Sequence, residues 1–149
     1  MIREATIDDI HNILPLSSLF SKSLGVGLFE EKYSDRHAAT LLASCVNNGV
    51  LLVAERDDKI VGVAGGIISN NIWNPTVKQI DEIIYFVLPE HRNTTVAYRL
   101  IKGYGSAIQK LDVHTGTMKL MHNSPDIGKH YAKLGFNELE TSYVWIKGG

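Results

Sequence analysis

The stretch that most restricts the fold runs from Gln79 to Leu111. It begins as an apolar, strand-like run, turns at Pro89, passes the cationic Arg92 and continues as a long amphipathic helix. The apolar stripe of this helix consists of Val96, Ala97, Leu100, Ile101, Tyr104, Ala107, Ile108 and Leu111. A chain that leaves a strand and enters a helix directs several backbone N–H groups at one point, where an anion can bind. This joint therefore predicts a site for a phosphate-bearing ligand.

The composition is that of an ordinary globular protein and argues against several functional classes. The 149 residues, 44% hydrophobic and 21% charged, suffice for one domain over residues 1–149. A formal net charge of −1 argues against a nucleic-acid partner. No apolar run approaches the roughly 20 residues of a membrane helix, so no membrane association is expected. The lone Cys45 predicts a cytoplasmic protein, and the absence of close Cys/His spacing predicts no metal site.

The N-terminal part predicts one strand and two helices. A short strand is expected at Ile2 to Glu4, followed by a capping box over Thr6 to Asp9 and a helix that Pro15 should end or kink. Ser21 to Tyr33 has no clean period and predicts a partly mobile loop. A second helix is then expected, capped by Ser34.

The middle of the chain predicts a hairpin and a central strand. Gly49 is expected to cap the end of the second helix, which buries Cys45 as a small packed hydrophobe. Val50 to Glu55 and Lys59 to Ile68 read as strands joined by an Asp-Asp turn. The central strand is expected over Gln79 to Leu88.

The C-terminal part predicts two further strands around a short helix. The strands are expected at Thr117 to His122 and Tyr143 to Lys147, and the helix should begin at Ser124-Pro125-Asp126 and stop at Gly135. The resulting order is β-α-α-β-β-β-α-β-α-β. This order is typical of an α/β (α+β) domain with a mixed sheet covered by helices.

Two motifs in this order resemble the GNAT superfamily of acyl-CoA-dependent N-acyltransferases. The first is Arg92 to Ala97, which is similar to the family pattern Q/R-x-x-G-x-G/A except that Thr95 replaces the middle glycine. The second is His130 to Phe136, which resembles the segment Y-x-K-L-G-F. The resemblance covers nearly the whole chain. It implies a mostly antiparallel central sheet flanked by helices, and transfer of an acetyl group from acetyl-CoA to a primary amine.

The resemblance also implies a set of residues that hold the acetyl-CoA cosubstrate. The backbone amides expected to cradle its diphosphate are those of Arg92, Asn93, Thr94, Thr95, Val96 and Ala97. The end of the central strand, Phe86, Val87 and Leu88, is expected to pair with the pantetheine arm, with the Phe86 N–H directed at the acyl carbonyl. Ser124 stands where the family often has an asparagine that contacts this arm.

Two residues are expected to take part in the chemistry. Tyr131 keeps its proton at neutral pH and suits a group that protonates the departing thiolate. Glu82 matches a general base of some family members. Regular alternation places Glu82 on one face of its strand with Ile84 and Phe86. A histidine such as His122, or a water molecule, stays open as an alternative base.

The acceptor is predicted less sharply than the donor. Loops that usually border the acceptor site in this family carry Phe29, Glu30, Tyr33 and Trp73, which suit a cationic amine on a small molecule or a peptide. A catalytically degenerate module that binds acyl-CoA or a protein partner is the alternative function. The sheet is expected either to be short at the edge near the last strand or to be completed by a second subunit in a homodimer.

Overall fold

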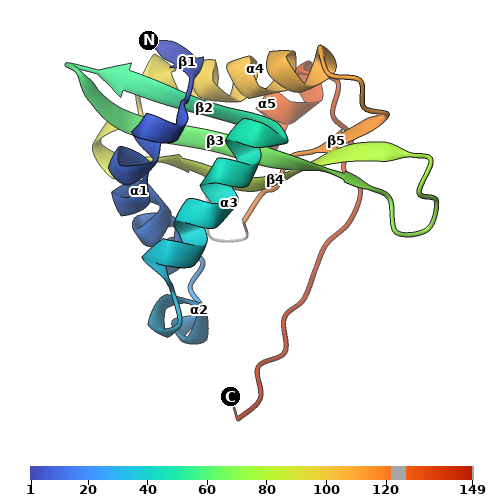
Figure 1. The fold of residues 1–149 in the computed structure, drawn as a ribbon, viewed down its shortest axis with the longest axis horizontal. Helices are drawn as coiled ribbons and strands as arrows, with labels where there is room; N and C mark the ends of the chain where they lie inside the picture. Colours follow the sequence, from blue (N-terminus) through green and yellow to red (C-terminus); the bar gives the residue numbers. More distant parts are fainter. Residues whose placement is uncertain (122–126, 149) are drawn as a thin grey trace.

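The computed structural model describes residues 1–121 and 127–148 (Figure 1). Its strands are β1 (Ile2–Glu4), β2 (Gly49–Arg56), β3 (Lys59–Asn70), β4 (Lys78–Val87) and β5 (Thr115–Thr117). Its helices are α1 (Ile10–Ser23), α2 (Gly27–Glu31), α3 (Asp35–Asn47), α4 (Thr95–Gln109) and α5 (Gly128–Lys133). Single 3₁₀ turns lie at Ile7–Asp9 and Pro89–His91. In these residues no helix is long and apolar enough to cross a membrane.

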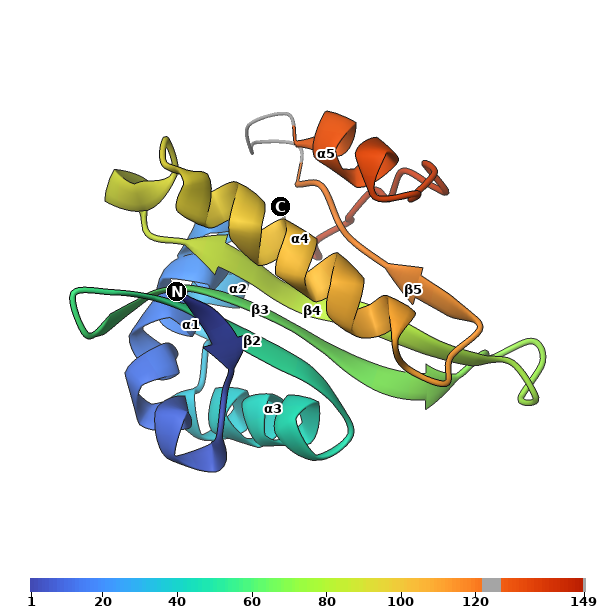
Figure 2. The same ribbon diagram turned by 90° about the horizontal axis from the view of Figure 1, so that it is seen from above.

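The strands form one sheet in the order β1-β2-β3-β4-β5. Neighbours from β1 to β4 are antiparallel, whereas β4 and β5 are parallel. Helices α1 and α3 lie on one face and α4 on the other (Figure 2). The predicted fold class, a mixed and mostly antiparallel sheet flanked by helices, is confirmed.

The sheet separates two apolar cores. The core under α1 and α3 contains Ile13, Leu16, Leu42, Cys45, Val63, Ile84 and Phe86. The core under α4 contains Leu52, Ala64, Ile80, Leu100, Tyr104 and Ile108. Cys45 is fully buried in the first, as predicted, and burial raises the pKa of its thiol to about 12. At neutral pH this thiol is therefore protonated and inert.

Local signals in the sequence locate several elements correctly. The Ser34 hydroxyl accepts the His37 N–H and caps α3. Asp57 and Asp58 have φ of 51° and 60°, the left-handed pair that a two-residue turn between β2 and β3 requires. The predicted hairpin is thereby confirmed. In each case the signal works because it satisfies a local backbone requirement.

Helix α1 continues past Pro15 to Ser23, so of the two expectations at this proline, an end or a kink, the end is wrong. Proline removes one N–H donor, but Leu16 and Ser17 beyond it are buried against the rest of the protein. The packing of the second half of α1 offsets the missing bond. The predicted loop from Ser21 to Tyr33 is likewise replaced by the end of α1 and the short α2.

Gly49 is the first residue of β2, and the helix cap expected of it is wrong. A Cβ atom at Gly49 would collide with the carbonyl oxygen of Gly66 on the neighbouring strand. Glycine is required here for the close approach of two strands. Helix α3 ends earlier, at Asn47.

The C-terminal elements differ most from the prediction. The strand expected over Thr117 to His122 is limited, among described residues, to Thr115–Thr117. The segment Tyr143 to Lys147 forms no strand; Tyr143 and Trp145 are 94% and 82% exposed, and the chain runs away from the sheet (Figure 1). Strand-forming residues become a strand only where they pair with another one. The expected helix start at Ser124 to Asp126 lies outside the described residues.

Arg3 of β1 ties the N-terminus to the start of α1. Its guanidinium donates to Asp9 through Nη1 and Nη2, both at 2.8 Å, and also pairs with Glu55 at the end of β2. The Asp9 carboxylate additionally accepts the Thr6 N–H at 2.7 Å, as the capping box predicts. These donors, Arg3 first, hold the pKa of Asp9 well below its usual range.

Replacing Asp9 by Asn is expected to lower the free energy of unfolding at pH 7 by about 1–3 kcal/mol, because Arg3 loses a charged partner. A lowered pKa contributes stability above the ordinary value of 3.8, and this stability is lost as the pH falls below it. The difference between D9N and the wild type should therefore shrink at pH 3. Urea unfolding of both proteins at pH 7 and pH 3 measures this difference in the free energy of unfolding.

The matched control is Asp8→Asn, which alters an exposed neighbour and should change stability by less than about 0.5 kcal/mol. If D9N and D8N are equally stable at pH 7, the contact between Arg3 and Asp9 makes no net contribution.

Candidate active site

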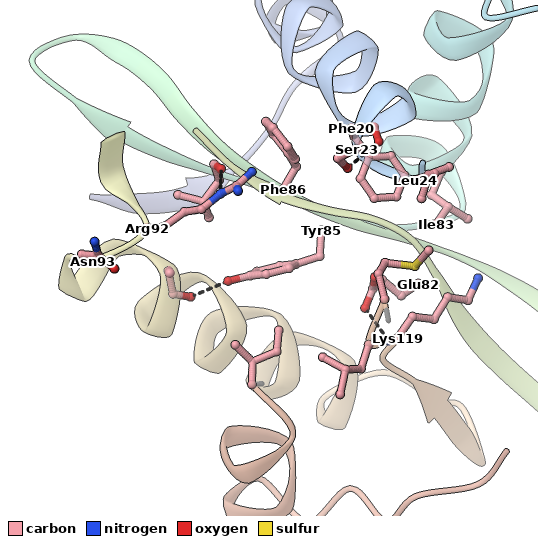
Figure 3. A pocket seen from close by; sticks show the side chains of 15 residues that line it. Phe20, Ser23, Leu24, Glu82, Ile83, Tyr85, Phe86, Arg92, Asn93 and Lys119 are labelled. Carbon is pink, nitrogen blue, oxygen red and sulfur yellow. Dashed lines mark hydrogen bonds between the residues drawn. The ribbon is translucent and has the colours of Figure 1, made fainter. Parts of the chain in front are cut away.

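A cavity of about 600 Å³ lies along the edge of β4 that β5 leaves open (Figure 3). The parallel pairing of the two strands covers only Gln79 to Asp81, opposite Thr115 to Thr117. Beyond this point β4 continues to Val87, and within residues 1–121 and 127–148 only β3 pairs with it there. The cavity is lined by residues of α1, β4, the joint before α4, α4 itself and the segment after β5.

A β-bulge at Ile83 decides which way Glu82 points. On β3 the consecutive residues Gly65 and Gly66 pair with Ile84 and Glu82, so Ile83 is the extra residue. Ile83 and Ile84 both pack toward α1 and α3. The expectation from regular alternation, that Glu82 shares a face with Ile84 and Phe86, is therefore wrong. The bulge turns Glu82 toward α4, on the same side as Tyr85 (Figure 3).

Glu82 is a buried acid that still borders the cavity. Its side chain is 4% exposed, and its Oε2 accepts the backbone N–H of Lys119 at 2.9 Å. Loss of solvation raises the pKa of Glu82 to about 7, and the Lys119 N–H opposes this rise only in part. Near neutral pH this carboxyl group can both take up and release a proton.

Tyr131 of α5 is connected to Glu82 through the same residue. Its hydroxyl donates to the carbonyl oxygen of Lys119 at 2.8 Å, so the two side chains hold both polar groups of one peptide segment. Burial raises the pKa of Tyr131, which keeps the phenol protonated. Tyr131 is not among the residues that line the cavity, whereas Tyr85 is. The Tyr85 hydroxyl donates to the Ala97 carbonyl oxygen at 3.0 Å.

The direction of the β4 amides follows from its pairing with β3. The Leu88 N–H donates to Val61 O at 2.9 Å, and Phe86 lies opposite Val63. Because hydrogen-bonded residues alternate along an antiparallel ladder, the Phe86 N–H faces β3. The predicted direction of this amide, toward an acyl group, is wrong. The amides that face the open edge are those of Tyr85 and Val87.

The joint before α4, meaning the segment between β4 and the first turn of α4, has fewer backbone N–H groups without a hydrogen-bond partner than expected. The N–H groups of Arg92, Thr94 and Val96 donate, each at 3.3 Å, to Pro89 O, His91 O and Thr94 Oγ1. In the described parts of the chain, the amides of Asn93, Thr95 and Ala97 have no such partner. These three, at the start of a 15-residue helix, form the anion-binding group that remains.

Thr95 fits its position without the glycine of the family pattern. Within residues 1–121 and 127–148, only Asp57 and Asp58 are non-glycine residues with positive φ, so Thr95 is not in the left-handed region. Thr94, not Thr95, caps the helix through its hydroxyl. The backbone here does not require glycine.

Arg92 lies across the far end of the open edge. Its Nε donates to the Val87 carbonyl oxygen at 2.8 Å, and its guanidinium lies 5.1 Å from the centre of the Phe86 ring. The side chain is exposed but held in place at the mouth of the cavity. It therefore adds positive charge where the free amides of the joint converge.

The cavity brings together only part of the predicted site. Of the residues expected to act on the donor or in the chemistry, those that line it are Glu82, Phe86, Val87, Arg92, Asn93 and Ala97. Those that do not line it are Leu88, Thr94, Thr95, Val96 and Tyr131. Ser124 and His122 lie outside the described residues.

None of the four predicted acceptor residues lines the cavity. Trp73 is 90% exposed in the loop between β3 and β4, and Phe29 and Glu30 are exposed on α2. Tyr33 is hydrogen-bonded to the Ser17 hydroxyl. The wall on this side is formed by residues that sequence reasoning missed: Phe20, Ser23, Leu24, Lys119, Leu120, Met121 and Ile127. No local signal distinguishes them, because tertiary packing brings them together.

In the described residues no group of three or more His, Cys, Asp or Glu side chains is arranged to hold a metal ion. Glu82 has the backbone of Lys119 as its partner and no second carboxylate. The described residues that line the cavity bring to it one buried carboxyl group, the phenol of Tyr85, the guanidinium of Arg92 and backbone donors.

Replacing Glu82 by Gln is expected to stabilise the protein above pH 7. The unfolded carboxyl ionises near 4.5 while the folded one keeps its proton up to about 7, so the wild type loses stability across this range. The loss is roughly 3 kcal/mol at 1.4 kcal/mol per pKa unit. E82Q should match the wild type at pH 4 and exceed it at pH 8, measured by urea unfolding. The exposed substitution Glu90→Gln serves as control; equal behaviour of both variants would contradict the burial effect.

Comparison with known proteins identifies the family. A family model described as the acetyltransferase (GNAT) domain matches residues 47–138, more than half of the chain. No curated protein matches the sequence.

Solved structures share the fold at low identity. A predicted acetyltransferase from Clostridium acetobutylicum, solved with acetyl-CoA, is 15% identical with a TM-score of 0.75, covering 98% of this chain and 95% of its own. The ribosomal-protein-alanine N-acetyltransferase of Brucella melitensis is 17% identical with a TM-score of 0.69, covering 98% and 99%. An aminoglycoside N-acetyltransferase in complex with CoA is 18% identical with a TM-score of 0.70, covering 100% and 95%. With the family match, the chain belongs to the GNAT acetyltransferases, enzymes whose acetyl donor is acetyl-CoA.

Proposed function

We propose that this protein transfers the acetyl group of acetyl-CoA directly to a primary amine while both substrates are bound. The observation that carries this proposal is Glu82, a buried carboxyl group with a pKa raised to about 7. It opens onto the same cavity as the unpaired edge of β4 and the joint before α4. A base of this kind lies beside the place where a bound acyl donor would present its thioester.

The free backbone donors fit an acyl-CoA. The amides of Asn93, Thr95 and Ala97, at the N-terminus of α4 and beside Arg92, would hold the diphosphate. The open edge of β4 at Tyr85 and Val87 would pair with the amide-containing pantetheine arm, as one strand pairs with another. Phe86, Val87 and Leu88 supply the strand end for this contact, and Thr94 and Val96 complete the first turn. Ser124 keeps its proposed contact with the arm.

Glu82 would make the amine nucleophilic. An acceptor amine enters mainly as an ammonium ion, and its nitrogen must lose one proton before it can attack the thioester carbonyl. The carboxylate of Glu82 takes up this proton and becomes a neutral carboxyl group. A pKa near the working pH favours both steps of this exchange. The C–N bond then forms and the C–S bond breaks. The new amide nitrogen loses its second proton while the departing thiolate gains one, so the phenol that protonates the thiolate is restored by the proton from the nitrogen.

A phenol would supply the proton to the thiolate. Tyr131 has a raised pKa and stays protonated, but its hydroxyl is engaged by Lys119 O. Tyr85 lines the cavity, and burial raises the pKa of its phenol too. We assign the role to Tyr131, with Tyr85 as the alternative that the variants below distinguish.

The acceptor would enter from the side of α1. Phe20 of α1, Leu24 directly after it, and Leu120 and Met121 after β5 border the cavity there. Structures with this fold include enzymes named for ribosomal-protein alanine and for aminoglycosides, so amines on both peptides and small molecules suit the fold. Phe29, Glu30, Tyr33 and Trp73 would contact only an acceptor that extends beyond the cavity.

Acetyl-CoA is expected to bind the wild type and E82Q alike, but only the wild type should release CoA thiol with an amine. At a hundredfold excess over Kd, binding stabilises the fold by about 2.7 kcal/mol. This raises Tm by roughly 5–10 °C for a domain of this size. Loss of a general base lowers kcat by about 10²–10⁴-fold. Thermal melting with acetyl-CoA and a thiol assay across a panel of amines measure both effects.

The outcomes separate the alternatives. No Tm shift in either protein would rule out acetyl-CoA binding. A shift without thiol release for any amine would favour the degenerate binding module. Full turnover by E82Q would remove Glu82 from the mechanism and leave water or a histidine as base.

Tyr131→Phe is expected to lower kcat more than it weakens acetyl-CoA binding, because only the proton donor is lost. The loss should reach about 10²-fold or more if Tyr131 is the acid. Steady-state kinetics with the best amine of the panel, together with the acetyl-CoA Kd, measure the two effects separately. Tyr85→Phe is tested in parallel, and Tyr98→Phe, at an exposed position of α4, is the matched control. A large kcat loss in Y85F with none in Y131F would transfer the role to Tyr85.

A further inference from the structure

The hydroxyl of Tyr104 is buried in the core under α4 without a hydrogen-bond partner. The side chain is 0% exposed, and no group within residues 1–121 and 127–148 accepts from or donates to its oxygen. Phenylalanine would fill the same apolar space without this unpaired oxygen. A buried polar atom of this kind points to a partner outside these described groups, such as a water molecule.

Gly66 of β3 makes room for this hydroxyl. A Cβ atom at Gly66 would collide with the Tyr104 oxygen and would come within 2.9 Å of the Asp81 carbonyl oxygen. The phenol therefore reaches down to the surface of the sheet. The requirement for glycine here comes from the close approach of a polar group.

Glu82 lies directly beside this point. Gly66 and Glu82 are opposite each other in the pairing of β3 with β4. Side chains at such positions start about 4.5–5.5 Å apart and point to the same face. The Tyr104 hydroxyl and the Glu82 carboxylate are thus neighbours on the α4 face. The Tyr104 oxygen forms no direct hydrogen bond with this carboxylate, so a link between the two groups requires a bridging water.

Three phenols lie close enough to Glu82 for its charge to act on them, and one backbone amide donates to its carboxylate. The phenols are Tyr85 on β4, Tyr104 on α4 and Tyr131 on α5; burial, and then the charge of Glu82, raise the pKa of each. The amide belongs to Lys119, and the positive charge on the side chain of Lys119 also favours the ionised form of the Glu82 carboxyl group.

Two of the three phenols have acceptors elsewhere. The Tyr85 hydroxyl donates to Ala97 O and the Tyr131 hydroxyl to Lys119 O. The charge of Asp81 also favours the protonated form of Tyr104. Tyr104 therefore retains a proton that it can direct toward Glu82.

We propose that Tyr104 is a positioning residue for Glu82, donating a hydrogen bond to a water molecule that in turn donates to the carboxylate. The inference rests on the proposed role of Glu82 as the base. The Oε2 atom of Glu82 already accepts from Lys119, so the bridging water is assigned to Oε1. The carboxylate is then fixed at both oxygen atoms while it faces the acceptor amine.

The proton transfer itself does not involve Tyr104. One proton passes from the ammonium nitrogen to the carboxylate, which becomes a neutral carboxyl group, and the nitrogen keeps the electron pair. Tyr104 stays a phenol throughout because its pKa is raised. A donor to the charged form of an acid lowers the pKa of that acid, so removing this donor must raise it.

The test is the titration of Glu82 in Tyr104→Phe. In protein labelled with ¹³C-glutamate, NMR follows the carboxyl carbon of Glu82, identified as the signal that E82Q lacks. The midpoint in Y104F should lie about half to one pH unit above that of the wild type. The acid limb of the pH–rate profile, measured with an amine that the wild type acetylates, should move by the same amount, while the acetyl-CoA Kd stays constant.

An unchanged midpoint together with a higher Tm in Y104F would overturn the proposal, because the hydroxyl would then be a buried group that only costs stability. Tyr98→Phe, on the same helix, should leave the midpoint unchanged. Gly66→Ala, which displaces the hydroxyl from the sheet, should raise the midpoint as Y104F does. The titration needs no acceptor, so it is independent of turnover. Wild-type turnover in E82Q would instead overturn the role of Glu82.

Discussion

The separation of β5 from β4 after Asp81 is the constraint on which the rest of this structure depends. One edge of β4 stays paired with β3 as far as Val87, which keeps the strand rigid, while the other edge becomes free. Unpaired amides inside a protein are costly unless they meet a ligand or water. The bulge at Ile83 lies next to the point of separation. Because bulges bend a strand and increase its twist, it helps both to open the edge and to turn Glu82 toward α4.

The parts of the fold that the sequence predicts correctly are those that depend only on residues close together in the chain. The Ser34 cap, the turn at Asp57 and Asp58 and the apolar stripe of α4 depend on residues a few positions apart. The two motifs around Arg92 and Tyr131 are local in the same sense. The family resemblance that they carry made the fold class predictable.

What could not be predicted depends on contacts between distant segments. A bulge leaves no mark in the alternation of β4, so the face of Glu82 was predicted wrongly. Helix α1 passes Pro15 because of its packing on the rest of the protein. Phe20 and Leu24 reach the cavity only through this same packing, whereas Trp73 has the composition of a binding residue and lies elsewhere.

The glycine pair at the centre of β3 has a kinetic consequence. Gly65 and Gly66 make the sheet thin: a Cβ on Gly65 would lie 3.4 Å from the Cys45 sulfur, whereas Gly66 contacts Tyr104 on the opposite face. Cys45 is the single cysteine of the chain and is inaccessible in the folded state. A thiol reagent can therefore react only when α3 moves away from the sheet. The rate at which a thiol reagent labels the unmodified protein therefore measures this local opening, on the face of the sheet opposite Glu82.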